Sequence, residues 1–322
     1  MPKPLVANPD NIRLAMLGMV EGNGHPFSWS AITNGRYDRQ MMARCGYPVI
    51  SEYLDAQPPQ ALGIPGAQVT HVWCDQPDHS RQVAAAAHIP CVVERPQDVI
   101  GKVDAVVIAT DVGSEHVQRV RPFLDAGLPA FIDKPLADNR SDLHQFITWR
   151  SEGKHFISTS CMRYAREFAE LRRQLPQVGE IRAITVMMAK SWERYGIHAL
   201  EAVYPLLPPG EYEWAVNTGD ERANVVHLRH RSGTDVILVT TSDLYGAFSQ
   251  VQVAGTKGVL AAKMTDTFYA FKSQLQAFVS YLRTGVEPVA FDQTCEQMAI
   301  IIAGLESRAR GGVRVPIQWA TA

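Results

Sequence analysis

The sequence predicts an α/β protein in two parts, a doubly wound parallel sheet followed by an α+β region with a large, open and mainly antiparallel sheet. Short apolar runs alternate with helical patterns in the first half, and hairpin signals dominate after about residue 155. A chain of 322 residues with 46% hydrophobic residues can bury enough surface for two domains. We expect these domains to span residues 1–138 and 139–322.

Four short apolar runs in the first half have the length and composition of buried parallel strands. They are Ile12–Gly18, Val69–Asp75, Asp104–Thr110 and Pro129–Asp133. Apolar residues at helical spacing predict helices over 114–126 and 140–150, with Pro122 expected to bend the first of them. Strand and helix therefore alternate, as a doubly wound sheet requires.

The second half predicts longer strands, hairpins and two amphipathic helices. The expected strands and hairpins lie at 180–190, at 224–242 with a turn at 231–234, and at 250–263 around 255–258. One helix places Leu275, Phe278, Val279 and Leu282 on a single face, and the other runs from Cys295 to Arg308. We expect both helices to pack against the body of the protein.

Charge and cysteine content exclude several classes of protein. The 31 basic and 33 acidic residues are spread along the chain, so neither nucleic acid nor a membrane surface is an expected partner. The first residues resemble neither a secretion signal nor a membrane span, which predicts a cytoplasmic protein. Five cysteines without a CxxC pair are expected to be reduced, with Cys74 and Cys91 acting as small buried hydrophobes.

The loop after the first predicted strand is rich in glycine. Glycines at 18, 22 and 24 depart from GxGxxG, so the loop is either a phosphate-binding turn or a turn without a ligand. Glu21 would repel a pyrophosphate, so it must point away if a dinucleotide binds there.

Asp75 ends the second predicted strand, where a carboxylate can accept both hydroxyl hydrogens of an adenosine ribose. That contact would favour NAD over NADP, and the alternative is a solvated aspartate that starts a turn. Positions 18 and 75 lie 57 residues apart, against the usual ~20, which predicts an insertion. We place it at about 37–66, a proline-rich rigid lobe beside the substrate entrance or a subunit contact.

Several ordered motifs resemble the family of glucose-fructose oxidoreductase, inositol dehydrogenase and rhizopine catabolism proteins (Gfo/Idh/MocA). They are Ile12–Gly18, Ala109-Thr110 with His116, Phe131-Ile132-Asp133-Lys134-Pro135-Leu136-Ala137, Arg163-Tyr164, Gly196-Ile197-His198 and Gly255-Thr256-Lys257-Gly258. Asp133-Lys134-Pro135 is the most specific of them, because it looks like the family's E-K-P signature with Asp in place of Glu.

The resemblance implies an N-terminal Rossmann domain and a C-terminal domain whose open sheet builds homodimers or homotetramers. It assigns cofactor contacts to Gly18, Val20, Gly22, Asn23, Gly24, Asp75, Ala109, Thr110, His116, Asp133, Lys134 and Pro135. Its lysine and histidine map onto Lys134 and His198. The glycine loop is rearranged, and Arg194 stands where many members have an aspartate four positions before the histidine.

Oxidation of a secondary alcohol needs a base near the hydroxyl and a positive charge near the developing alkoxide. Lys134 and His198 are suitable groups, and Glu201 lies one helical turn after His198, where it could orient the imidazole. No third ligand accompanies this pair at a recognisable spacing, so no metal is expected. Side chains that suit a polyol or a sugar acid are Arg163, Tyr164, Trp192, Arg194, Tyr195 and Glu201.

The sequence therefore predicts an NAD(P)-dependent oxidoreductase that acts on a secondary alcohol or ketone of a sugar, sugar acid or cyclitol, with NAD as the preferred cofactor. Two alternatives stay open. One is a cofactor-binding sensor or pseudoenzyme that lost activity through Arg194 and the altered loop. The other is a lyase or glycosidase that oxidises its substrate transiently with tightly held NAD.

Overall fold

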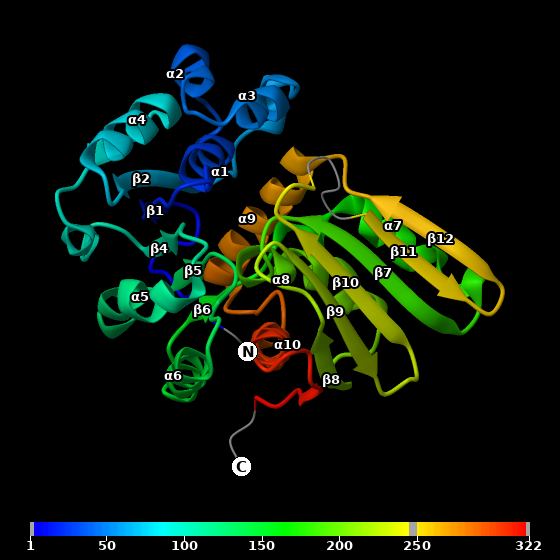
Figure 1. Cartoon of the computed structure of the whole chain (residues 1–322). Coiled ribbons are helices and arrows are strands. Elements are labelled where there is room, and N and C mark those ends of the chain that lie inside the picture. Colours follow the sequence, from blue (N-terminus) through cyan, green and yellow to red (C-terminus); the bar gives the residue numbers. More distant parts are fainter. Residues whose placement is uncertain (1–2, 245–249, 320–322) are drawn as a thin grey trace.

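The protein consists of two sheets with helices between and around them, as the computed structural model shows for residues 3–244 and 250–319 (Figure 1). The first sheet is parallel and has helices on both faces. The second sheet is mainly antiparallel and has helices on one face. The predicted fold class is confirmed.

The parallel sheet has the strand order β3-β2-β1-β4-β5-β6. Its strands are β1 Ile12–Leu17, β2 Ala67–Trp73, β3 Cys91–Val92, β4 Ala105–Ile108, β5 Ala130–Ile132 and β6 Phe156–Ile157. All of its pairings are parallel, and β1 and β4 are almost entirely buried because helices cover both faces. The strand order reverses between β1 and β4, where such sheets bind ligands. With β6, the sheet extends past residue 138 to residue 157.

The helices of this half are α1 His25–Asn34, α4 Pro77–Ala87, α5 His116–Asp125 and α6 Arg140–Ser151. Short 3₁₀ turns, η2 Pro96–Val99 and η3 Gly113–Glu115, connect strands to helices. Pro122 lies inside α5, and the helix continues to Asp125 because Val120, Phe123 and Leu124 are buried against the sheet.

The segment between α1 and β2 is the predicted insertion. It forms α2 Arg39–Ala43, α3 Pro48–Asp55 and the 3₁₀ turn η1 Pro59–Ala61, so its prolines begin helices instead of breaking them. Tyr47 and Ile50 of this segment lie so close to Gly24 that a Cβ on that glycine would come within 2.8 and 2.6 Å of them. The insertion therefore supports the glycine-rich loop directly.

The second sheet has the order β12-β11-β7-β10-β9-β8-β13. Its strands are β7 Ile181–Ala189, β8 Tyr212–Asn217, β9 Ala223–His230, β10 Asp235–Thr241, β11 Gln250–Gly255, β12 Gly258–Lys263 and β13 Val315–Pro316. Both predicted hairpins are confirmed as antiparallel pairs, and β7 and β10 form a parallel pair in the centre. Met187, Val225 and Val259 are exposed on this sheet.

Three of the remaining helices are α7 Arg166–Gln174, α8 Trp192–Val203 and α10 Phe291–Ala309, and 3₁₀ turns flank the first two at η4 Cys161–Tyr164, η5 Leu175–Val178 and η6 Tyr204–Leu206. Helices α8 and α10 pack on the inner face of the antiparallel sheet (Figure 1). The sequence analysis predicted no element at α1, α4, α7, β3, β6, β8 or β13. Strands β3, β6 and β13 have two residues each, too few for a periodic pattern.

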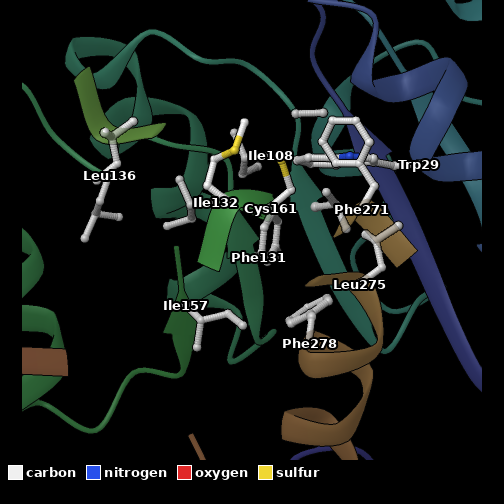
Figure 2. Packing of buried hydrophobic residues seen from close by; sticks show 14 of the residues in the cluster. Trp29, Ile108, Phe131, Ile132, Leu136, Ile157, Cys161, Phe271, Leu275 and Phe278 are labelled. Carbon is white, nitrogen blue, oxygen red and sulfur yellow. The ribbon is translucent and has the colours of Figure 1, made fainter. Parts of the chain in front are cut away.

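The last helix, α9 Thr267–Thr284, returns to the parallel sheet. Phe271, Leu275 and Phe278 point toward Phe131 and Trp29 (Figure 2), and the Phe131 and Phe278 ring centroids are 5.6 Å apart. Lys272 donates a hydrogen bond to the Ala61 carbonyl of the insertion. Helix α9 thus joins the two halves of the chain around one apolar core.

Among the helices in the described ranges, none combines the length and the apolar character needed to cross a membrane.

All five cysteines are free thiols. Cys74 is buried as predicted, whereas Cys91 is exposed because β3 is a two-residue strand at the edge of the sheet.

Candidate active site

A cavity of about 450 Å³ opens at the carboxyl ends of β1, β2 and β4. Ligands of open parallel sheets bind at this edge. The lining residues are Leu17, Gly18, Trp73, Asp75, Pro96, Gln97, Ile108, Glu115, Gln118, Arg119 and Phe123. Gly18 and Asp75, predicted separately from two distant segments, thus line the same cavity.

Gly18 adopts a positive φ of +87°, a conformation that residues with a Cβ rarely adopt. A Cβ there would lie 2.7 Å from Cγ2 of Thr110, so the first strand approaches the fourth too closely for any larger residue. The Thr110 hydroxyl is buried and has no hydrogen-bond partner within the described residues. A glycine-lined cavity with an unpaired hydroxyl beside it fits the adenosine and phosphate part of a dinucleotide.

Asp75 is held at the edge of this cavity. Its carboxylate pairs with Arg119 at 2.9 Å and accepts a hydrogen bond from the Met19 N–H at 3.3 Å. Arg119 also pairs with Glu115 at 2.8 Å. Any contact from Asp75 to a ribose must therefore form beside a guanidinium, a neighbour that the sequence did not predict.

The glycine-rich loop itself has an exposed outer part and a buried inner part. Glu21 and Gly22 are exposed, so water surrounds Glu21. Val20 is half-buried and accepts a hydrogen bond from the Asn23 N–H at 3.1 Å. Asn23 and Gly24 are buried, and Gly24 begins helix α1 as its N-cap.

Asn23 connects this loop to the predicted Asp-Lys-Pro motif. Its amide donates to Asp133 Oδ2 at 3.0 Å and to the Ala109 carbonyl at 3.4 Å. His25 contacts the same Asp133 oxygen through Nδ1 at 2.7 Å and stacks on Trp29 with ring centroids 4.1 Å apart. His25 was not among the predicted site residues, although its place in the glycine-rich loop could have indicated it.

Lys134 follows β5 and is almost fully buried. Its Nζ lies 3.4 Å from Asp111 Oδ2 and 4.6 Å from the centroid of the Tyr195 ring. Burial alone would lower the pKa of this lysine, but the carboxylates of Asp133 and Asp111 outweigh it and raise the pKa. Lys134 is therefore an ammonium ion at neutral pH.

Asp111 was not predicted either. It lies in the loop after β4 and binds both Lys134 and Arg194. Burial would raise its pKa, but these two cations lower the pKa to about 2. Asp111 therefore carries a permanent negative charge beneath the two cations.

His198 on α8 shares the Tyr195 ring with Lys134. Its imidazole lies 4.8 Å from that ring, centroid to centroid, and its Nδ1 is 2.6 Å from the Ser160 hydroxyl. Burial, followed by the charges of Lys134, His25 and Lys190, lowers its pKa well below 6.5. His198 is therefore neutral at pH 7 and able to accept a proton.

The predicted pairing of Glu201 with His198 is corrected by the structure. Glu201 forms an ion pair with Arg163, which also donates to Gln293 at 3.3 Å. Nδ1 of His198 instead meets Ser160, a residue on a preceding turn that helical spacing could not reveal. Tyr164 is half-buried, and its hydroxyl donates to Thr159 at 3.4 Å.

Trp192, predicted to contact substrate, is a core residue. Its side chain is fully buried, and Nε1 donates to the Ile301 carbonyl of α10 at 3.0 Å. Gly196 and Gly304 leave the space that the indole fills, because a Cβ at either would lie within 2.6 Å of the ring. Large aromatic side chains stabilise cores through their buried area, and no pattern in the sequence indicated which face of α8 would be buried.

Arg194 and Lys190 reach from the second half of the chain to the glycine-rich loop. Arg194 binds Asp111 and donates to the Glu21 carbonyl at 3.1 Å. Lys190, another residue that the sequence analysis missed, donates to the Gly22 carbonyl at 3.2 Å and to the Tyr195 hydroxyl at 2.6 Å. These hydrogen bonds connect the glycine-rich loop to the N-terminal end of α8.

The remaining predicted residues support the loops. His116 is fully buried with Nε2 2.7 Å from the Thr110 carbonyl and Nδ1 3.2 Å from the Leu136 carbonyl, so it fastens these two loops together. Ala109 is buried and donates to the Leu17 carbonyl, and Pro135 follows Lys134 through a cis peptide bond. In the part of the chain that the structure describes, no three His, Cys, Asp or Glu residues are grouped to hold a metal ion.

Residues 44–158 match the family model for the oxidoreductase family with an NAD-binding Rossmann fold, Gfo/Idh/MocA. The predicted resemblance to that family is thereby confirmed. No curated protein matches the chain significantly.

Solved structures share the fold over almost the whole chain. A putative myo-inositol dehydrogenase from Sinorhizobium meliloti is 18% identical, with 96% of this chain and 100% of that chain covered and a TM-score of 0.71. Scyllo-inositol dehydrogenase from Lactobacillus casei is 14% identical, with 96% and 99% covered and a TM-score of 0.75. An oxidoreductase from Agrobacterium radiobacter, solved with NAD+, L-tartaric acid and magnesium, is 16% identical, with 95% and 98% covered and a TM-score of 0.71.

Proposed function

We propose that this protein, whose residues 44–158 match the NAD-binding Rossmann model of the Gfo/Idh/MocA oxidoreductases, is an NAD-dependent dehydrogenase of a secondary alcohol in a sugar, sugar acid or cyclitol. One observation supports this proposal above the others. Lys134 and His198 come from segments 64 positions apart, yet both lie against the Tyr195 ring. The inositol dehydrogenases among the similar folds and the tartaric acid bound to the Agrobacterium protein agree with a polyhydroxylated substrate.

The cofactor would occupy the cavity beside Gly18, with its adenosine ribose at Asp75. Gly18, Val20, Gly22, Asn23 and Gly24 would supply the phosphate loop. Thr110, Asp133, Lys134 and Pro135 would border the nicotinamide, whereas Ala109 and His116 would hold their loop in place. When bound, NAD+ supplies the acceptor for the hydride.

The protein's own groups divide the proton chemistry between them. His198, held neutral by burial and by neighbouring cations, accepts the hydroxyl proton of the substrate. Ser160 orients the imidazole through Nδ1. The Lys134 ammonium stabilises the negative charge that develops on the substrate oxygen, and Asp111 holds that ammonium in place. Arg163, Tyr164, Arg194 and Tyr195 would surround the substrate, with Glu201 positioning Arg163.

The direct test measures the rate of NAD+ reduction with a panel of cyclitols, aldoses and uronic acids. The absorbance of the NADH that forms reports this rate. We expect at least one of these classes to give sustained reduction of added NAD+. Binding of NADH without reduction by any compound would favour a sensor. Copurified NAD with product formation but no net change in added NAD+ would favour a lyase or glycosidase.

Replacing Asp75 with alanine should weaken NAD+ binding more than NADP+ binding. The variant loses the ribose acceptor and frees Arg119, now paired with Asp75 at 2.9 Å, to meet a 2′-phosphate. We expect the NAD+ over NADP+ preference to fall by ~10-fold or more, about 1.4 kcal/mol. Dissociation constants for both cofactors measure this, with Asp78→Ala, an exposed carboxylate on α4, as the control. Equal losses for the two cofactors would place the ribose elsewhere.

The proposal includes a nucleotide-binding part at about residues 1–138 and a substrate-binding part at 139–322, although β6 and α9 of the latter pack with the parallel sheet. It also includes a homodimer or homotetramer built on the open sheet, on which Met187, Val225 and Val259 are exposed.

A further inference from the structure

The candidate active site holds more positive than negative charge. Lys134, Lys190 and Arg194 meet around Tyr195 and Asp111: both ammonium groups lie within 5 Å of the Tyr195 ring centroid, at 4.6 and 4.3 Å. The two cations at Asp111 share its single carboxylate.

The other buried carboxylate of the site does not balance the third cation. Asp133 accepts hydrogen bonds from Asn23 and from the Lys134 backbone N–H, and it pairs with His25. Glu21 is exposed, and Arg194 donates to its backbone carbonyl. The three cations therefore exceed the two buried carboxylates, Asp111 and Asp133, by one positive charge.

Lys190 is the cation without a carboxylate. Among the described residues, Lys190 forms no ion pair, and its ammonium group donates to the Gly22 carbonyl and to the Tyr195 hydroxyl. It is half-buried, and its backbone adopts a φ of +66°, which is uncommon for a residue with a side chain. Strained backbone of this kind is typical of functional sites.

Arg194 also has unused capacity to donate. Its Nη2 serves Asp111 and the Glu21 carbonyl, while its Nε finds no partner in the described part of the chain. About a third of the side chain, 31%, is exposed, although Nε itself is buried. A planar guanidinium with spare N–H groups matches a carboxylate.

We infer that the substrate carries a carboxylate and that Lys190 and Arg194 bind it, which makes the natural substrate a sugar acid and not a neutral polyol. This inference rests on the proposed function and narrows it. Lys134 and His198 would face the hydroxyl that is oxidised, and the carboxylate would exchange with the loop carbonyls that Lys190 and Arg194 now hold.

A cofactor pyrophosphate is the other anion that these cations could serve. Phosphates bind to backbone N–H groups of a glycine loop. Lys190 and Arg194 instead bind the carbonyl oxygens of Gly22 and Glu21 in this loop. These oxygens are hydrogen-bond acceptors, whereas a phosphate needs the N–H donors. The contacts favour a substrate carboxylate.

The test compares matched sugars that differ in one carboxylate, D-glucuronate with D-glucose and D-galacturonate with D-galactose. Calorimetry at constant ionic strength measures the dissociation constant of each sugar for the complex of the protein with NADH. We expect the uronates to bind at least ~10-fold more tightly than the neutral sugars. In Lys190→Met and Arg194→Gln, singly and combined, this preference should fall by ~10-fold or more. The NADH dissociation constant should change less than the preference does, since these side chains reach the phosphate loop only through the carbonyls of Gly22 and Glu21. Arg182→Gln, an exposed arginine paired with Glu180 on β7, is the matched control and should keep the preference.

Equal affinity for charged and neutral sugars in the unsubstituted protein would overturn the inference. So would a combined variant that loses NADH affinity while its uronate preference persists, because the cations would then serve the pyrophosphate. Uronate binding is also measured without cofactor. A protein that failed to bind NADH would refute the proposed dehydrogenase, and its charge preference would still be read from this second titration.

Discussion

Replacing Lys134 with methionine is expected to lower turnover of NAD+ by at least ~100-fold, about 2.7 kcal/mol of transition-state stabilisation. The side chain keeps its length but loses the ammonium group, which lies 3.4 Å from Asp111 Oδ2 and is nearly inaccessible to water. Asp111 retains Arg194 as a partner, so the fold should tolerate the change. NADH affinity should stay nearly unchanged, because the adenosine cavity lies at other residues.

The matched control is Lys102→Met, which removes an exposed lysine from the same half of the chain. Steady-state kinetics and NADH titration are measured on both proteins, together with their melting temperatures. A Lys134→Met protein that folds and turns over at the original rate would remove Lys134 from the mechanism.

Replacing His198 with glutamine is expected to lower kcat/KM by ~100-fold or more, because general-base catalysis contributes on this scale. The pH profile is equally informative. Only the neutral imidazole accepts a proton, and burial together with Lys134, His25 and Lys190 lowers the pKa of His198 well below 6.5. Activity should therefore stay level as the pH falls to 6.5 and decline only at lower pH.

Two further variants complete this test. His144→Gln changes an exposed histidine on α6 and should leave the profile unaltered. Ser160→Ala removes the hydroxyl 2.6 Å from Nδ1, which should lower kcat less than His198→Gln does, and Ser160→Thr should restore part of the loss. An acidic limb at or above pH 6.5 in the unsubstituted protein would contradict the assignment of His198 as the base.

The Asp133-Lys134-Pro135 motif shows how far local sequence could predict the candidate site. The apolar run before it predicts a buried strand, and a buried parallel strand ends at the edge where ligands bind. The position of Lys134 followed from that rule. Its partner Asp111 did not, because the contact depends on how the loops after β4 and β5 approach one another.

Helix α8 shows the opposite case. The sequence predicted helical spacing for His198 and Glu201. It did not predict that Trp192, Arg194 and Tyr195 belong to the same helix, nor which of the five face the site. Packing decided this, since Gly304 of α10 accommodates Trp192 in the core while Tyr195 and His198 turn toward Lys134. Glu201 was expected to serve His198 and instead serves Arg163, which lies 38 positions earlier.

By itself, the sequence determined the two-sheet architecture, the longer strands apart from β8, helices α5, α6, α9 and α10, and the resemblance to one family, because burial periodicity, turn residues and ordered motifs are local properties. Only the tertiary structure decided which side chains contact one another. The pairs are Arg119 with Asp75, Ser160 with His198, His25 with Asp133, and Lys190 with the Gly22 carbonyl of the glycine-rich loop. Charge and hydrogen bonding act over a few ångströms in space. Residues far apart in the chain therefore acquire their pKa values and their chemistry only when folding brings them together.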